Sequence, residues 1–114
     1  MQLATHVVPT LTVNQYSYWM DGQHTGELFL MKDELGQVAW RSKVSNLTTP
    51  WHGKWIIEEG EIWIRFDYTG RDNTQKWAML NGENGVDYLG RRIHAVLKHT
   101  WRLDSNGAGF LLGS

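Results

Sequence analysis

Apolar and polar residues alternate along much of the chain, and a period of two is typical of β-strands that bury one face. Residues 61–68 have apolar side chains at the even positions and, apart from Trp63, polar side chains at the odd positions. Residues 38–44 alternate in a similar way. Residues 26–32 are apolar at odd and even positions alike, which predicts a strand that is covered on both faces.

Turn residues separate these segments at short intervals, for example at Asp21-Gly22 and at residues 58–60. One five-residue pattern recurs: a glycine, a polar residue, an apolar residue, any residue and a second apolar residue. It begins at Gly26, Gly36, Gly53 and Gly60. We interpret each as a turn residue that tolerates positive φ and is followed directly by a strand. The spacing predicts an all-β fold, in which residues 1–114 form a single domain built as one antiparallel meander closed as a small β-barrel. A sandwich is the alternative architecture.

Residues 91–103 fit two kinds of secondary structure. As a strand, they place mainly apolar residues at odd positions and basic residues at most even ones. As a helix, Ile93, Val96, Leu97 and Trp101 would line one side. We favour a strand because the alternation is long and its neighbours are strands. A β-sheet with one C-terminal helix at residues 91–103 is the alternative.

Composition excludes several classes of function. The chain of 114 residues has no cysteine, which rules out disulfides, zinc–thiolate sites and thiol catalysis. His94 and His99 would point to opposite faces of a strand and would be poorly aligned on a helix, so they cannot share a metal in either. We therefore expect no metal site and no cofactor. The N-terminus lacks the pattern of a signal peptide, and no segment is apolar enough to span a bilayer. We expect a cytoplasmic protein without a membrane partner.

Tryptophan is the unusual feature of the composition, because the chain has seven. A mostly apolar cavity with a few polar groups is typical of a small-molecule site, although a small barrel can also be filled by its own side chains. We predict a binding module that takes an apolar or aromatic small molecule in a Trp-lined cavity. Its predicted ligand-binding residues are Trp40, Trp55, Tyr68, Trp77, His99 and Trp101.

Trp51 and Trp63 interrupt the local pattern, since one lies in a predicted loop and the other on a polar strand face. Aromatic side chains concentrate at protein interfaces. These two residues are therefore candidates for contact with a partner at the surface, including a second copy of the chain.

The segment Gly53-Lys54-Trp55 at the start of a strand, with Arg102 late in the meander, resembles the calycins, which are the lipocalin, fatty-acid-binding and avidin-like barrels. In that family a Gly-x-Trp opens the first barrel strand and an arginine of the last strand packs over the tryptophan. The resemblance implies a closed antiparallel barrel with a small apolar ligand. It also implies that Trp55 and Arg102 are structural and close one end.

Two other functions remain as alternatives to a binding module. A barrel enzyme of the cyclase or isomerase type would use His99 for acid–base chemistry, but no residue pattern identifies a catalytic group. A protein- or nucleic-acid-binding domain would use the basic face of Arg92, Lys98 and Arg102. The net charge of −1 favours a solvated strand face over a nucleic-acid partner.

Overall fold

The computed structural model describes residues 11–32, 36–43, 53–66, 76–103 and 109–113, and all its regular elements are β-strands. In chain order they are β1 (Leu11–Met20), β2 (Gln23–Lys32), β3 (Val38–Ser42), β4 (Gly53–Glu58), β5 (Glu61–Phe66), β6 (Lys76–Asn81), β7 (Asn84–Val86), β8 (Arg92–Leu103) and β9 (Gly109–Gly113). The ambiguous segment at residues 91–103 is therefore a strand, as we favoured. Within the described ranges there is no helix of the length and apolar character needed to cross a membrane.

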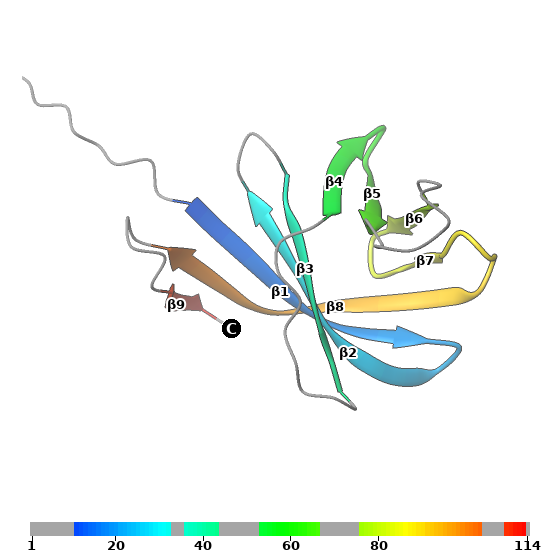
Figure 1. Cartoon of the computed structure of the whole chain (residues 1–114), viewed down its shortest axis with the longest axis horizontal. Coiled ribbons are helices and arrows are strands. Elements are labelled where there is room, and N and C mark those ends of the chain that lie inside the picture. Colours follow the sequence, from blue (N-terminus) through cyan, green and yellow to red (C-terminus); the bar gives the residue numbers. More distant parts are fainter. Residues whose placement is uncertain (1–10, 33–35, 44–52, 67–75, 104–108, 114) are drawn as a thin grey trace, which may run out of the picture.

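Eight of the strands form an antiparallel meander that closes into a barrel, apart from one narrow seam. The strand order is β3-β2-β1-β8-β7-β6-β5-β4, so each strand of the meander pairs with the next one in the chain except β3 with β4, and β8 returns to pair with β1 (Figure 1). β9 pairs with β8 outside this ring. The all-β meander and the nearly closed barrel confirm the predicted fold class.

The seam lies between β3 and β4, where a single bridge joins Gln37 to Lys54. Trp55 strengthens this junction with two hydrogen bonds. Its backbone N–H donates to the carbonyl oxygen of Gly36 at 2.8 Å, and its indole Nε1 donates to the carbonyl oxygen of Met31 at 2.8 Å. Trp55 thus joins β4 to the end of β2. Arg102 lies on β8, with β1, β2 and β3 between it and β4, and among the described contacts it does not pack over Trp55. That part of the calycin-based expectation is therefore wrong.

Two hairpins are set by the short turns that the sequence predicts. Asp21 and Gly22 have φ of 49° and 81°, and Glu59 and Gly60 have φ of 52° and 81°. Two consecutive residues with positive φ are characteristic of the type I′ turn, whose twist matches that of paired strands. The second turn places Glu58 opposite Glu61, and it thereby sets the register of β4 against β5.

The turn between β7 and β8 depends on one buried carboxylate, that of Asp87. Asp87 Oδ1 accepts the backbone N–H groups of Leu89 and Arg91 at 2.9 and 2.8 Å, and Oδ2 accepts Nε of Arg91 at 2.7 Å. Burial acts to raise the pKa of Asp87, but the hydrogen bonds and the charge of Arg91 outweigh it and hold the pKa below the ordinary value of 3.8.

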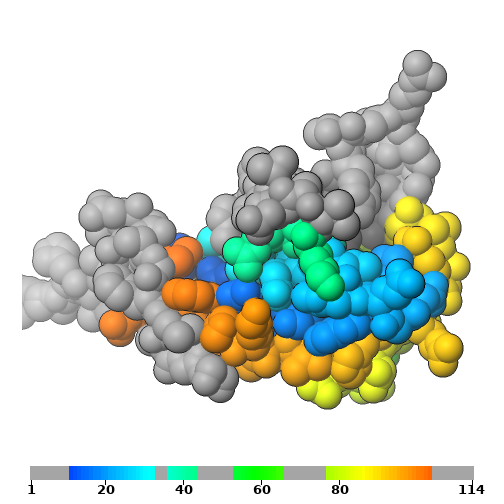
Figure 2. All heavy atoms as spheres, turned by 90° about the horizontal axis from the view of Figure 1, so that it is seen from below, coloured from blue at the N-terminus to red at the C-terminus, as the bar shows by residue number. Residues whose placement is uncertain are grey.

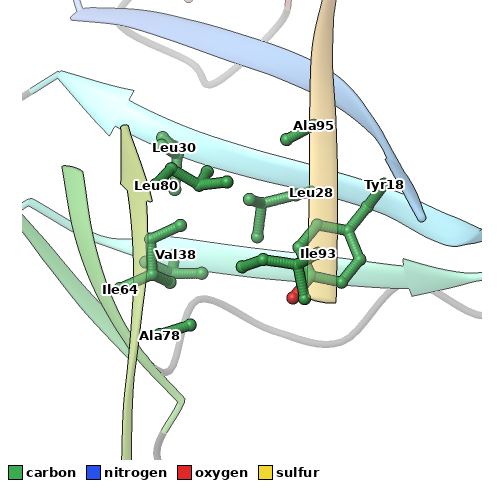
Figure 3. Close-up of a cluster of buried hydrophobic side chains, with 9 residues drawn as sticks. All are labelled: Tyr18, Leu28, Leu30, Val38, Ile64, Ala78, Leu80, Ile93 and Ala95. Carbon is green, nitrogen blue, oxygen red and sulfur yellow. The ribbon is translucent and has the colours of Figure 1, made fainter. Parts of the chain in front are cut away.

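The barrel core is made of side chains that alternate inward from six strands. Nine buried residues form one cluster and point toward one another (Figure 3). They are Tyr18, Leu28, Leu30, Val38, Ile64, Ala78, Leu80, Ile93 and Ala95. Tyr16, Met20, Trp40, Trp55 and Ile62 pack against them. The inward positions of β3 and β5 are those that the alternating pattern predicts.

Gly26 has a different role from the one we predicted. It lies inside β2 rather than in a turn, opposite Tyr18 on one side and Ser42 on the other. A Cβ atom at this position would lie 2.8 Å from Cζ2 of Trp40 and 2.3 Å from the carbonyl oxygen of Arg41. The missing side chain makes room for Trp40, which packs edge-on against Tyr18 with ring centroids 5.3 Å apart.

β2 is buried on both faces, as its continuous apolar sequence predicts. Leu28 and Leu30 face the core, while Met31 and Glu27 are buried on the opposite, outer side. β8, β1 and β2 lie side by side and are seen in Figure 2 as orange, blue and lighter blue bands. These three strands form the longest paired part of the molecule.

A β-bulge in β8 changes the faces that we predicted for its second half. Leu97 pairs with Tyr16 and His99 pairs with Gln15, so Lys98 is the extra residue. An extra residue reverses the alternation beyond it. His99 therefore leaves the inward face of Ile93 and Ala95.

The same reversal moves Trp101 outward and Arg102 to the side opposite Arg92. The predictions that His99 and Trp101 share the face of Ile93, and that Arg92 and Arg102 share one basic face, are therefore wrong. A bulge is not visible in a pattern of apolar and basic residues, because the pattern continues through it.

Candidate ligand groove on the outer face

A shallow groove lies on the outer face of β4, β5 and β6. Its volume is about 250 Å³, and the described residues that line it are Ile56, Glu58, Trp63 and Trp77. Two indole rings and an isoleucine make the surface mainly apolar, and Glu58 adds one carboxylate. Apolar pockets with few polar groups are the usual form of small-molecule sites.

The hairpin of β4 and β5 positions three of these side chains. Ile64 is buried in the core, so its neighbour Trp63 must point outward. The register pairs Trp63 with Ile56 on β4 and with Met79 on β6. Glu58 follows Ile56 by two residues and therefore lies on the same outer face.

Trp77 reaches the groove from β6 because Ala78 and Leu80 occupy the inward positions of that strand. Trp77 pairs with Arg65 on the neighbouring strand β5. The guanidinium carbon of Arg65 lies 5.6 Å from the centre of the Trp77 ring. This distance is within the range of a cation–π contact. The aromatic surface beside the groove is thus already in contact with one cation.

The two ends of the groove differ in charge. Glu58 and Glu61 face each other across β4 and β5 on the outer side, next to Trp63. Lys54 and Arg65 face each other further along the same strands. Among the described residues, neither Glu58 nor Glu61 takes part in an ion pair. One end of the groove is therefore acidic, and the other is basic.

The predicted ligand-binding residues do not lie together. Trp40 and Trp55 pack against the core from inside the barrel, whereas Trp77 lines the outer groove. His99 and Trp101 lie on the outer side of β8, where Trp101 Nε1 donates to Oε1 of Gln15 at 2.8 Å. Tyr68 and Trp51 lie outside the described residues.

Trp63, predicted as a surface residue, does line the groove. Its neighbours Ile56 and Glu58 were not among the predicted site residues. The Glu59-Gly60 turn could have identified them, because a two-residue turn places 58 opposite 61 and hence 56 opposite 63. The contribution of Trp77 depends on the pairing of β5 with β6, which no local signal in the sequence gives.

A second group of polar and aromatic side chains lies on the outer face of β1, β2 and β8. The buried Glu27 accepts a hydrogen bond from Oγ of Ser17 at 3.3 Å, and its Oε1 lies 3.4 Å from Nζ of Lys98 and 3.9 Å from Nε2 of His24. Because Lys98 is paired with Glu27, its charge is offset locally. The positive charge of the predicted basic face of Arg92, Lys98 and Arg102 is therefore reduced further.

Trp19 lies between two histidines in this second group. Its ring centroid is 5.0 Å from that of His24 and 5.5 Å from that of His94. His94 Nδ1 in turn lies 2.9 Å from Oδ1 of Asn84. The contact of Trp19 with His24 follows from the Asp21-Gly22 hairpin, but that with His94 depends on the closure of the barrel by β8.

Among the described residues, no group is placed to orient His99 for acid–base chemistry. Within that part of the chain its Nδ1 is enclosed without a hydrogen-bond partner, and its ring packs against Trp101 at 5.9 Å. A catalytic histidine needs a group that orients it and raises its basicity. Among the described residues, no group of three or more His, Asp or Glu side chains is arranged to hold a metal ion.

Comparison of the chain with family models, with curated proteins and with solved structures gave no significant match.

Proposed function

We propose that this protein is a binding module that takes a small ligand with an apolar or aromatic surface between Trp63 and Trp77. The observation that carries the proposal is the groove of about 250 Å³ that these two indoles line with Ile56 and Glu58. The proposal keeps the ligand class that the tryptophan content predicts but moves the site from the barrel interior to its outer face.

The composition of the barrel interior supports the outer location. A barrel of eight strands is just wide enough for side chains to fill its interior. Nine buried side chains converge there, and two of the predicted tryptophans pack against them as part of the core. The calycin resemblance of Gly53-Lys54-Trp55 agrees with the barrel architecture and with a structural role for Trp55, whose indole bonds to Met31.

The exposed aromatic surface is the second support. Trp63 and Trp77 are only partly buried, and Ile56 beside them is 37% exposed. Fully burying an exposed apolar side chain of this size contributes about 1.5–3 kcal/mol, and covering these partly buried side chains contributes a fraction of that. A ligand that covers these side chains would therefore gain binding free energy from apolar surface that the fold leaves exposed to water.

The proposal is tested by ligand-observed NMR with separate panels of small aromatic molecules, lipophilic molecules, sugars and oligonucleotides. We expect the aromatic and lipophilic panels to give saturation transfer. Trp63→Ala and Trp77→Ala should each lower the affinity for the responding compounds at least tenfold. The matched control is Trp101→Phe, which alters a tryptophan on the outer face of β8 and should leave the affinity unchanged.

Two results would contradict the proposal. One is the absence of any response from the aromatic and lipophilic panels with a folded protein. The other is a response that persists in both groove variants, which would move the site elsewhere. A response confined to the oligonucleotide panel and abolished by salt would favour the nucleic-acid alternative instead.

A further inference from the structure

The polar group in the groove gives information about the charge of its ligand. Glu58 is the charged residue among the described side chains that line the groove, and it lies at the acidic end, opposite Glu61. Like charges directly opposite each other on a sheet are unfavourable. Because no described cation forms an ion pair with either carboxylate, a positively charged ligand group would remove this repulsion.

The indole rings favour a particular type of cation. The face of a tryptophan attracts cations, and most strongly those that have little hydration to lose. Arg65 already lies over the ring of Trp77 at 5.6 Å. A bare metal ion would need several oxygen or nitrogen ligands, and no such group occurs among the described residues. An organic cation with an apolar surface suits both the indoles and the carboxylate.

The size of the groove limits the part of the ligand that it holds. At about 250 Å³ it is smaller than the roughly 300–1,000 Å³ of sites for drug-sized ligands. It is therefore suited to a compact head group, with the rest of the ligand in solvent. The basic pair of Lys54 and Arg65 should direct the positive group of the ligand toward Glu58.

We propose that the groove recognises an alkylated ammonium group, with the methyl groups against Trp63 and Trp77 and the charge toward Glu58. This inference rests on the proposed function and narrows its ligand class. The ammonium group could belong to a free small molecule such as choline or to a methylated lysine side chain of a peptide. The chemistry of recognition is the same in both cases.

The test compares choline with 3,3-dimethyl-1-butanol, which has the same shape and no charge, by isothermal titration calorimetry and ligand-observed NMR. We expect choline to bind at least fivefold more tightly. Glu58→Gln should weaken the binding of choline roughly two- to fivefold, as expected for the loss of one exposed charge contact, and should change the binding of the alcohol less than twofold. The matched control is Glu83→Gln, which removes an exposed carboxylate from another hairpin and should have no effect.

The outcomes separate the inference from the proposed function. Equal binding of choline and the alcohol, both weakened by Trp63→Ala, would overturn the cation inference and retain the binding groove. Binding of neither compound, together with no response from the aromatic and lipophilic panels, would overturn both. Glu58→Gln tests the inference even if a tryptophan variant fails to fold, because Glu58 is exposed.

A further arm identifies the source of the ammonium group. A short peptide with one trimethyl-lysine is compared with the same peptide carrying unmodified lysine. Tighter binding of the methylated peptide than of choline would support the inference with a peptide as source. Binding of choline alone would support it with a small molecule as source. Equal binding of the two peptides, with no preference for choline over its neutral analogue, would overturn it.

Discussion

The sheet of β1, β2 and β8 and the hairpin of β4 and β5 are both antiparallel, but their side chains lie in very different environments. In β2, Leu28 is fully buried toward the core, and Met31 on the opposite face is 5% exposed. In β4, Ile57 lies on the same side as Trp55 but is 64% exposed. The hairpin tip therefore projects beyond the packed part of the barrel.

The difference distinguishes the region that stabilises the fold from the region whose surface is available for binding. We expect most of the stability to come from the sheet of β1, β2 and β8, whose core-facing side chains include Tyr18, Leu28 and Ile93. The hairpin is joined to β3 by one bridge and carries an aromatic groove on its outer side. Surfaces that are not needed for the core are the ones available for binding.

The largest expected effect separates the two regions by stability. Leu28→Ala should lower the free energy of unfolding by about 3–4 kcal/mol, because it leaves a cavity at a fully buried position. Ile57→Ala should cost less than about 1 kcal/mol, because that side chain is already mostly exposed. Urea unfolding followed by circular dichroism measures both. Equal costs would mean that the hairpin is packed as firmly as the sheet.

The second prediction concerns the junction between the regions. Trp55→Phe removes the hydrogen bond from Nε1 to the carbonyl oxygen of Met31 and should cost about 1–2 kcal/mol. Amide exchange should accelerate in β4 and β5 more than in β1 and β8. Trp101→Phe removes an equivalent bond to Gln15 and serves as control, since it lies within the sheet. Uniform acceleration in both variants would contradict a weak seam.

The third prediction uses the turn that leads from β7 into β8. Asp87→Asn should destabilise the protein by about 1 kcal/mol at pH 7, because the amide cannot form the charged contact with Arg91. The pKa of Asp87 is lower in the folded protein than its ordinary value of 3.8, so its contribution is present above pH 4 and is lost as the pH falls through the folded value.

The two proteins should therefore differ in stability at pH 7 and converge as the pH falls through the folded-state pKa of Asp87, by the same linkage. Urea midpoints measured from pH 2.5 to pH 7 test this. A difference that stays constant over the whole range would show that the charge of Asp87 does not contribute.

The smallest expected effect is a gain in stability at the groove. Glu58→Gln removes the repulsion between Glu58 and Glu61 and should raise the free energy of unfolding by about 0.3 kcal/mol at low salt. The gain should disappear in 1 M salt, which screens exposed charges. Glu83→Gln should give no gain. A loss of stability would mean that Glu58 has a structural partner.

The sequence alone determined the strand content and the register of two hairpins, β1 with β2 and β4 with β5. Alternation identified the inward faces of β3 and β5, and the double apolar pattern of residues 26–32 identified β2 as buried on both faces. The Asp21-Gly22 and Glu59-Gly60 turns specify which residues oppose each other in their hairpins. These features are local, because side-chain direction and turn geometry depend on neighbouring residues.

The tertiary structure decided which of these faces meet. The bulge at Lys98 moved His99 and Trp101 out of the barrel, although the local pattern continues unchanged through it. The pairing of β5 with β6 brought Trp77 to Trp63 and formed the groove. The return of β8 to β1 brought His94 to Trp19. Such contacts join residues far apart in the chain, and only the closure of the barrel fixes them.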